Sequence, residues 1–506
     1  MLMRAFVLLL ATLLVLLPTW LRGDWDGTEG RRVQIALEML HGDNWMIPML
    51  GGEPTWAKPP LHYWLLMLCT KCFGVDYMML RLPAVLAVFA SSLLAGEILR
   101  SRFGAAAGWM VAFGIICSPL VVFVWPTAEI DPLFASLTGM SIWLLAAGAA
   151  HQRKMMVLAS GLLAGLAFLQ KGPPFFLFAF GAYLVWFRHR RLRLAFWHFV
   201  PMALVIAAYF APLWLSYVDP AGMLKIVNEE SVGRIKFFEW KHVRETPFFW
   251  LRAIMVLLPF GFWCFWEWRG ARDVRMSAND LTLRMCSGGA VLAVVLFTLF
   301  PGRPTRYLLP NVMLFTFAVA PAVAHFFRHR GTVPVFARGV LWFFGFFGTV
   351  ALMVIPFVPR AGDASVGLAL VAALLPLVVR TPRQVVLASL IVPVLASWTV
   401  GLERSLRWSE SKRATVASGE LLRRELDALA ASEDLGSYGH LDSAVLLASG
   451  LWPEGDEMRR RLPDTRWVLH EDTNLRRIQS AQHVIRWRLH LPFKTFVLRE
   501  HVPTPK

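Results

Sequence analysis

Basic side chains stand in short segments that glycine and proline make stiff. Lys58 precedes two prolines, Lys171 lies in Gln-Lys-Gly-Pro-Pro, and Arg303 and Arg306 lie in Pro-Gly-Arg-Pro-Thr-Arg-Tyr. Proline fixes φ and interrupts a helix, so each cation is held on a stiff turn. These segments fall close to apolar runs, where such cations either bind an anion, for example a lipid phosphate, or simply reach a lipid headgroup.

Carboxylates at two other places have the chemistry of a general base. From residue 29 to residue 40 the apolar side chains follow helical spacing, and Glu29 and Arg31 lie in the first turn of this surface helix. Asp131 opens an apolar run and is followed by proline. Acids at helix starts also serve as caps or dipole partners, and that alternative stays open. A carboxylate at a membrane boundary is costly, and general base catalysis is one reason to keep it there.

A third polar segment contains Glu230 and Arg234, which are spaced i, i+4 and therefore share one helix face. They are either a substrate-binding pair or a plain helical ion pair. His242 lies near Glu239 and Glu245, and such a group can hold a divalent metal ion, although a lone histidine is more often not a ligand. We assign no metal site and no certain cofactor, and a divalent metal stays an alternative.

The elements that must position these residues are transmembrane helices. The chain has 506 residues and is 57% hydrophobic. Apolar runs of about 15–23 residues, the length that crosses a bilayer core, recur about thirteen times. We expect spans near residues 5–22, 79–99, 105–123, 130–150, 155–170, 173–187, 197–217, 248–268, 286–301, 305–326, 335–357, 364–380 and 384–402. The first run lacks a small-x-small cleavage site, so we interpret it as an uncleaved span.

Basic loops set the orientation of these spans. With the N-terminus in the cytoplasm, each cytoplasmic loop is short and basic: Arg100–Arg102, Arg153–Lys154, Arg188–Arg193, Arg269–Arg284, Arg328–Arg330 and Arg380–Arg383. The net charge of +17 therefore reflects membrane topology and does not indicate nucleic-acid binding. The five cysteines lie in or beside apolar runs, which argues against a disulfide framework.

This topology divides the chain into two parts. We expect residues 1–403 to form a transmembrane domain with external loops at 23–78 and 218–247. Residues 404–506 have the composition of a soluble domain and follow the last span, so we expect a small α/β domain on the outer face. Within it, residues 412–432 have helical periodicity, and Trp467–His470 and Thr495–Arg499 have strand character.

A series of short motifs occurs in order over roughly residues 5–330. They are Thr28-Glu29, Glu38-Met39, GDNWMIP, KPPLHYW, RLPAVL, Asp131, QKGPP, Glu230 with Arg234, and GRPTRYLLP. Together they resemble bacterial GT-C glycosyltransferases of the aminoarabinose transferase and protein O-mannosyltransferase type. The resemblance implies a GT-C fold with about thirteen spans in the bacterial inner membrane. It also implies transfer of a sugar from a polyprenyl-phosphate carrier, such as undecaprenyl phosphate, to an acceptor on the periplasmic face by an inverting displacement.

The same resemblance implies roles for individual residues. Lys58 would bind the carrier phosphate with help from Arg303 and Tyr307, and a cation there would stabilise the departing phosphate. Glu29 and Asp131 would be the catalytic carboxylates. The remaining residues that we expect to bind substrate are Arg31, Lys171, Glu230 and Arg234.

The chain departs from the family pattern at two positions. Thr28 stands where the family commonly has Asp, which leaves Glu29, Asp131 and Asp26 as candidates for the base. Ala57 stands where aminoarabinose transferases carry a Glu implicated in metal binding, which argues against a metal site of that kind.

The function predicted from the sequence is therefore a membrane glycosyltransferase. Its acceptor is lipid A, another envelope glycan or a protein, its environment is membrane lipid, and we expect a monomer. The alternative is a transporter or flippase of lipid-linked sugars. A transporter predicts charged residues deep within the spans, whereas the ionisable residues here cluster at the ends. A purely structural assembly subunit would leave the external acids and cations unexplained.

Overall fold

The computed structural model describes a defined part of the chain. The described residues are 2–20, 28–50, 53–124, 126–188, 192–216, 249, 280–298, 305–329, 384, 424, 435–438, 467–471, 483–490 and 495–501. The chain divides into two compact units. The first unit comprises Met1–Arg22, Ala57–His62 and Arg81–Arg404, and the second comprises Gly23–Trp56, Tyr63–Leu80 and Ser405–Lys506.

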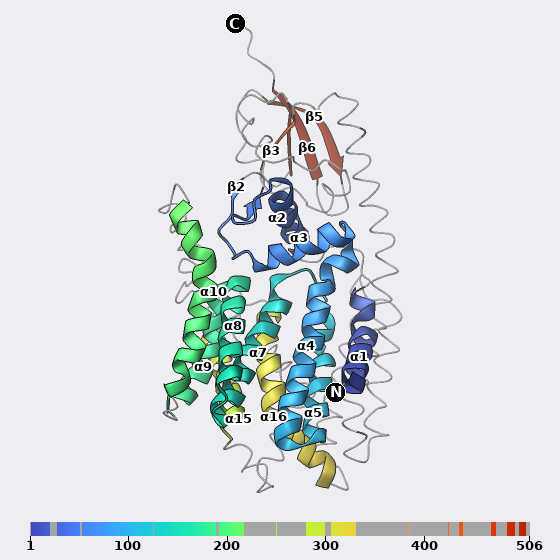
Figure 1. Ribbon diagram of the computed structural model, residues 1–506. Coiled ribbons are helices and arrows are strands. Elements are labelled where there is room, and N and C mark those ends of the chain that lie inside the picture. Colours follow the sequence, from blue (N-terminus) through green and yellow to red (C-terminus); the bar gives the residue numbers. More distant parts are fainter. Residues whose placement is uncertain are drawn as a thin grey trace. The chain divides into compact units, whose positions relative to one another are not determined.

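The secondary-structure elements described in the first unit are helices (Figure 1). Its elements are α1 (Leu2–Trp20), most of α4 (Tyr77–Phe103), α5 (Ala105–Ile116), α6 (Pro119–Val124), α7 (Ile130–His151), α8 (Lys154–Lys171), α9 (Pro174–Arg188), η1 (Leu192–Leu194), α10 (Ala195–Ser216), α15 (Leu281–Phe297), η3 (Thr305–Leu308) and α16 (Leu309–His329). Their boundaries follow the apolar runs of the sequence, except that the run predicted as one span at 105–123 is divided between α5 and α6.

The helices are those of a membrane protein. Within the described residues, five stretches are long and apolar enough to cross a membrane: Tyr77–Phe103, Ile130–His151, Lys154–Lys171, Ala195–Leu215 and Arg306–His325. They coincide with predicted spans. The spans predicted near 248–268, 335–357, 364–380 and 384–402 lie outside the described residues apart from positions 249 and 384, so the total of about thirteen stays a prediction.

The core of the first unit is a set of closely packed helices. α7 packs against α8 and α16, α8 packs against α10, and α9 packs against α15. Glycines allow the backbones to approach closely, as is common in membrane bundles. A Cβ atom added to Gly181 of α9 would lie only 2.2 Å from the carbonyl oxygen of Gly288 in α15. Between α7 and α16, Trp143 stacks on Phe317 with ring centroids 5.2 Å apart.

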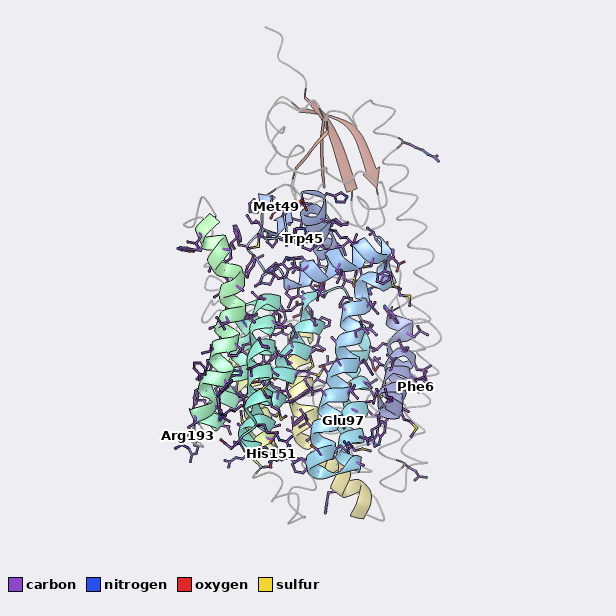
Figure 2. All side chains as sticks on the ribbon, viewed as in Figure 1. Phe6, Trp45, Met49, Glu97, His151 and Arg193 are labelled. Carbon is purple, nitrogen blue, oxygen red and sulfur yellow. The ribbon has the colours of Figure 1, made fainter. Side chains whose placement is uncertain are left out.

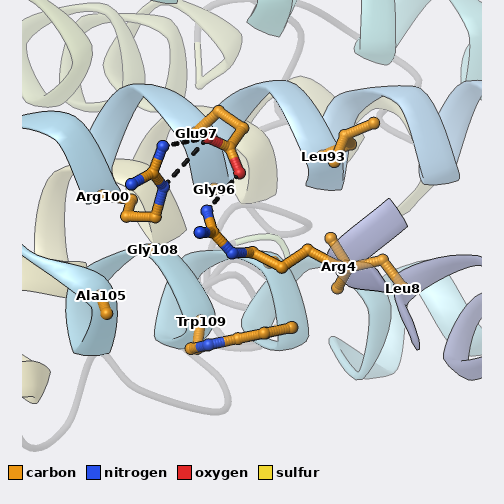
Figure 3. A pocket seen from close by; sticks show the side chains of 10 residues that line it. Arg4, Leu8, Leu93, Gly96, Glu97, Arg100, Ala105, Gly108 and Trp109 are labelled. Atoms are coloured by element: carbon orange, nitrogen blue, oxygen red, sulfur yellow. Dashed lines mark hydrogen bonds and ion pairs between the residues drawn. The ribbon is translucent and has the colours of Figure 1, made fainter. Parts of the chain in front are cut away.

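Charged side chains gather at one end of the first unit, where Figure 2 labels Glu97, His151 and Arg193. At this end Arg4 of α1 donates to Glu97 of α4 at 2.7 Å, and Arg100 donates to the other oxygen of Glu97 at 2.7 Å and 3.0 Å (Figure 3). These bonds tie α1 to α4 beside a small pocket that Trp109 also lines. Two basic loops predicted to be cytoplasmic, Arg100–Arg102 and Arg153–Lys154, are described and adjoin Glu97 and His151 in the sequence, and a third, Arg188–Arg193, is described except for residues 189–191.

The second unit contains short elements and a sheet. α2 (Glu29–His41) confirms the helix predicted for residues 29–40, and it is followed by β1 (Met49–Leu50), β2 (Glu53–Pro54) and α3 (Leu61–Phe73), whose first two residues belong to the first unit. The four-stranded sheet has the order β3-β4-β6-β5, with β3 parallel to β4 and the other pairs antiparallel. Its strands are β3 (Leu435–Tyr438), β4 (Trp467–Glu471), β5 (His483–His490) and β6 (Thr495–His501).

Two strands predicted from the sequence, Trp467–His470 and Thr495–Arg499, are thereby confirmed as β4 and β6. The helix predicted for residues 412–432 lies outside the described residues except for position 424. The assignment of residues 404–506 as a separate α/β domain stays a prediction.

Candidate functional site

The first turn of α7 carries the buried carboxylate Asp131. Glu129 is the N-cap residue in an extended conformation, and Pro132 follows within the first turn, where a proline costs no helical hydrogen bond. Both carboxylate side chains are buried. His151 ends the same helix, so Asp131 lies about 30 Å from the charged end of the unit shown in Figure 2, at 1.5 Å rise per residue.

Asp131 belongs to a charged cluster drawn from three elements. Lys171, the last residue of α8, donates from Nζ to Asp131 Oδ1. Arg306 of η3 places Nε 3.2 Å from Asp131 Oδ2, as an ion pair without hydrogen-bond alignment, and Nη1 3.9 Å from Glu129 Oε1. We call these residues, Glu129, Asp131, Lys171 and Arg306, the charged cluster. Its two carboxylates balance its two cations, which allows it to be buried.

Aromatic rings surround the ammonium of Lys171. Its Nζ lies 4.0 Å from the ring centroid of Tyr307 and 5.2 Å from that of Phe134. Cation–π attraction adds to the ion pair with Asp131 and is stronger in a desolvated place. The ammonium of Lys171 therefore contacts the Asp131 carboxylate and two aromatic rings. The Arg306 side chain is 32% exposed, so it is the more accessible cation of the cluster.

The turn that carries Lys58 packs against the turn that follows α8. The half-buried Lys58 donates from Nζ to the carbonyl oxygen of Ala57 at 2.7 Å. A Cβ atom added to Gly172 would lie 3.8 Å from Pro59 Cγ, so the two turns are in van der Waals reach. Gly172 has φ +84°, a conformation that favours glycine, and this explains the glycine after the Gln-Lys pair.

The predicted site residues therefore fall into three groups. Asp131, Lys171 and Tyr307 are brought together, and Lys58 lies in the same unit on the turn beside Gly172. Glu29 and Arg31 are in α2 of the second unit. Three predicted residues lie outside the described residues: Glu230, Arg234 and Arg303.

The sequence analysis counted Arg306 among the cations that bind an anion or a lipid headgroup, but did not place Glu129 or Arg306 among the site residues, although both are members of the charged cluster. A signal was present, since Arg306 shares its Gly-Pro-stiffened segment with Arg303. Within the described residues, no group of three or more His, Cys, Asp or Glu side chains is arranged to hold a metal ion. The alternative metal ligands predicted from the sequence, His242 with Glu239 and Glu245, lie outside those residues.

Comparison with known sequences supports the predicted resemblance. Residues 57–215 match the family described as dolichyl-phosphate-mannose-protein mannosyltransferase. The chain is 28% identical over 364 residues to the undecaprenyl phosphate-alpha-4-amino-4-deoxy-L-arabinose arabinosyl transferase of Pseudomonas savastanoi pv. phaseolicola, covering 65% of this chain and 63% of the relative. It is 27% identical over 313 residues to the enzyme of the same name in Edwardsiella ictaluri, covering 56% of this chain and 53% of the relative. The match thus spans less than two thirds of the length of these relatives.

Comparison with solved structures identifies the fold. The crystal structure of ArnT from Cupriavidus metallidurans bound to undecaprenyl phosphate superposes with a TM-score of 0.72, at 16% identity, covering 97% of this chain and 96% of that one. The same protein in the apo state gives a TM-score of 0.72, also at 16% identity, covering 98% of this chain and 97% of that one. The chain therefore has the GT-C fold, as predicted, and its resemblance to the aminoarabinose transferase type is confirmed.

Proposed function

We propose that this chain is a membrane glycosyltransferase of the GT-C type. It takes a sugar from a polyprenyl-phosphate carrier and passes it to an acceptor on the periplasmic face of the bacterial inner membrane. The observation that carries the proposal is the buried charged cluster at the ends of α7, α8 and η3, in a fold shared with a protein bound to undecaprenyl phosphate. Buried charge is costly, so a cluster of this kind at a helix end favours a functional site.

The reaction is an inverting displacement at the anomeric carbon of the sugar. An oxygen of the acceptor attacks that carbon, and the bond from the carbon to the carrier phosphate breaks, with its electron pair leaving on the phosphate. Cations stabilise the negative charge that develops there, which is the role we assign to Lys58 and Arg306. Because Lys171 is enclosed by Asp131, Tyr307 and Phe134, we assign it to positioning Asp131.

The proton of the acceptor passes to a carboxylate. Asp131 has one oxygen bonded to Lys171 and the other paired with Arg306, so in this arrangement it orients cations. Glu29 therefore stays the predicted base, with Asp131 and Asp26 as the alternatives, and Asp26 lies outside the described residues. Arg31, Glu230, Arg234 and Arg303 stay predicted substrate-binding residues.

Further parts of the proposal concern organisation and acceptor. We propose that the N-terminus is cytoplasmic, that residues 404–506 form an outer α/β domain, and that the protein is a monomer with about thirteen spans. The curated relatives are named for transfer of an aminoarabinose from undecaprenyl phosphate. We propose lipid A as the first acceptor to test, with another envelope glycan or a protein as the other acceptors.

The test is a transfer assay with purified protein in detergent. Radiolabelled undecaprenyl-phosphate sugars serve as donors, and lipid A or a membrane extract serves as acceptor. Lys58→Ala and Asp131→Asn are expected to abolish transfer. Asp280→Asn is the matched control: it removes the charge of the partly buried Arg102–Asp280 pair near the start of α15 but keeps a good N-cap residue, so transfer should persist.

Each other outcome contradicts a part of the proposal. Normal transfer by both site variants would show that the charged cluster and the Lys58 turn are not the active site. Absence of transfer with every donor, together with movement of the lipid across reconstituted vesicles, would identify a transporter instead.

A further inference from the structure

Two buried polar side chains join the Lys58 turn to the segment that leads into α7. His62 places Nε2 2.8 Å from the carbonyl oxygen of Ala128. Gln170 places Nε2 3.1 Å from the carbonyl oxygen of Ile130 and 3.2 Å from His62 Nδ1. His62 is 4% exposed and Gln170 is fully buried. We call this pair, His62 and Gln170, the His–Gln clasp.

The two carbonyl groups determine how the clasp is protonated and oriented. A carbonyl oxygen only accepts hydrogen bonds, so Nε2 of His62 donates to Ala128 and the amide nitrogen of Gln170 donates to Ile130, which leaves Nδ1 of His62 as an acceptor from that amide. The amide nitrogen of Gln170 then donates to both Nδ1 and the Ile130 oxygen. Reversing the amide would place two acceptors against each other at Ile130. These contacts are therefore consistent with one arrangement of donors and acceptors.

One polar atom of the clasp makes no hydrogen bond in this network. Gln170 Oε1 is buried without a hydrogen-bond partner among the described residues. A buried acceptor without a partner is destabilising, and an apolar side chain at the same position would avoid that loss. A glutamine that only filled space would gain nothing from its amide, so the two bonds made by its nitrogen are the feature to be explained.

The clasp connects segments that carry the proposed active-site residues. His62 follows Lys58 by four positions, Gln170 directly precedes Lys171, and the two carbonyl groups belong to the residues on either side of Glu129. Asp131 follows directly. The contact between Pro59 and Gly172 described above is a second junction of the same turns.

We propose that His62 and Gln170 are positioning residues, which hold the phosphate-binding turn of Lys58 in register with the carboxylates of the charged cluster. The inference rests on the proposed function. Neither side chain reaches the reacting atoms, and both act through Lys58 and Asp131. A displacement of about 1 Å in a reacting group costs roughly 100-fold in rate, which is the reason to fix such turns by directional bonds.

The first experiment measures the affinity of the purified full-length protein for undecaprenyl phosphate in detergent. His62→Leu removes both hydrogen bonds and is expected to weaken binding about tenfold, equivalent to one lost buried hydrogen bond. His62→Gln supplies a donor for Ala128 and an acceptor for Gln170, so it is expected to restore most of the affinity.

A double-variant cycle separates positioning from general stability. If the clasp acts through Lys58, the Lys58→Ala and His62→Leu effects are not additive, and the double variant binds within about twofold of Lys58→Ala alone. Additive losses of affinity would overturn the positioning role. So would a His62→Gln variant that binds as poorly as His62→Leu.

A second experiment needs no carrier. Hydrogen exchange measured by mass spectrometry should become faster in peptides covering residues 57–62 and 127–131 in His62→Leu, but not in His62→Gln. The matched control is His198→Leu, since His198 is also a buried histidine and its nitrogens lie 2.8 Å from Ser160 Oγ and 2.8 Å from Tyr183 Oη. His198→Leu is expected to lower thermal stability while leaving exchange in both peptides and carrier affinity unchanged.

The two experiments distinguish failure of the clasp from failure of the proposed function. Unchanged exchange in His62→Leu, with normal carrier binding by the wild type, overturns the clasp alone. Absence of carrier binding by the wild type overturns the proposed function and, with it, the positioning role.

Discussion

Replacing Lys171 with methionine is expected to destabilise the protein through the charged cluster. The side chains of Lys171 and Asp131 are 8% and 7% exposed, and methionine keeps much of the lysine volume without its charge. Removing one partner of a buried ion pair costs about 3–5 kcal/mol, and loss of the contacts with the rings of Tyr307 and Phe134 adds about 1–2 kcal/mol. Arg306 still lies 3.2 Å from Asp131 and offsets part of this loss. We therefore expect a net loss of about 3 kcal/mol.

The assay is equilibrium unfolding in mixed micelles, applied to Lys171→Met, Asp131→Asn and the double variant. The neutral double variant has no uncompensated carboxylate, so its loss should be smaller than the sum of the single losses by about 2 kcal/mol. Lys154→Met is the control, because Lys154 is exposed and its Nζ lies 5.5 Å from the Trp197 ring. A Lys171→Met protein as stable as the control, or strictly additive losses, would refute the reasoning.

Three further substitutions test other parts of the structure. Gly172→Ala forces a side chain into a conformation with φ +84°, so we expect the free energy of unfolding to fall by about 1–3 kcal/mol and undecaprenyl phosphate to bind more weakly. An unchanged free energy of unfolding and an unchanged affinity would contradict the assigned turn. Gly181→Val places a side chain against the carbonyl oxygen of Gly288, which lies 2.2 Å from the position of the Cβ atom alone. The variant should separate α9 from α15 and therefore lower the melting temperature in detergent. A melting temperature equal to that of the wild type would count against this packing. Asp280→Ala removes both the N-cap of α15 and the ion pair with Arg102, and loss of the cap alone is expected to lower the free energy of unfolding by about 1–2 kcal/mol. Asp280→Asn keeps a capping side chain and should recover most of the loss that is due to the cap. Equal losses in the two variants would exclude the capping role.

Several features of the fold were predictable because they depend on short stretches of chain. The apolar runs that became α7, α8 and α16 are visible as runs of membrane-spanning length. The helical spacing of residues 29–40 predicted α2, and the strand character of residues 467–470 and 495–499 predicted two strands. Turns rich in glycine and proline likewise predicted that Lys58 and Lys171 have fixed positions in the structure.

The partners of those cations were not predictable in the same way. Lys171 was predicted to bind substrate, and the sequence did not indicate that its ammonium contacts Asp131, Tyr307 and Phe134. Arg306 was predicted to bind an anion or a lipid headgroup, and its pairing with Asp131 and Glu129 was not predicted. His62 had no signal beyond its place after the Lys-Pro-Pro-Leu motif, since its carbonyl partner lies 66 positions further along the chain.

The sequence by itself determined where helices run, where they end, and which charged residues stand at those ends. Hydrophobic length, proline and glycine act over a few residues, so their consequences can be predicted locally. Only the tertiary structure decided which cation meets which carboxylate. That choice depends on the register between helices, which packing fixes at contacts such as Trp143 on Phe317 and Gly139 beside Met313. Because α7 and α16 pack closely at these contacts, Arg306 lies beside Asp131. This pairing depends on contacts between segments that are distant in the sequence.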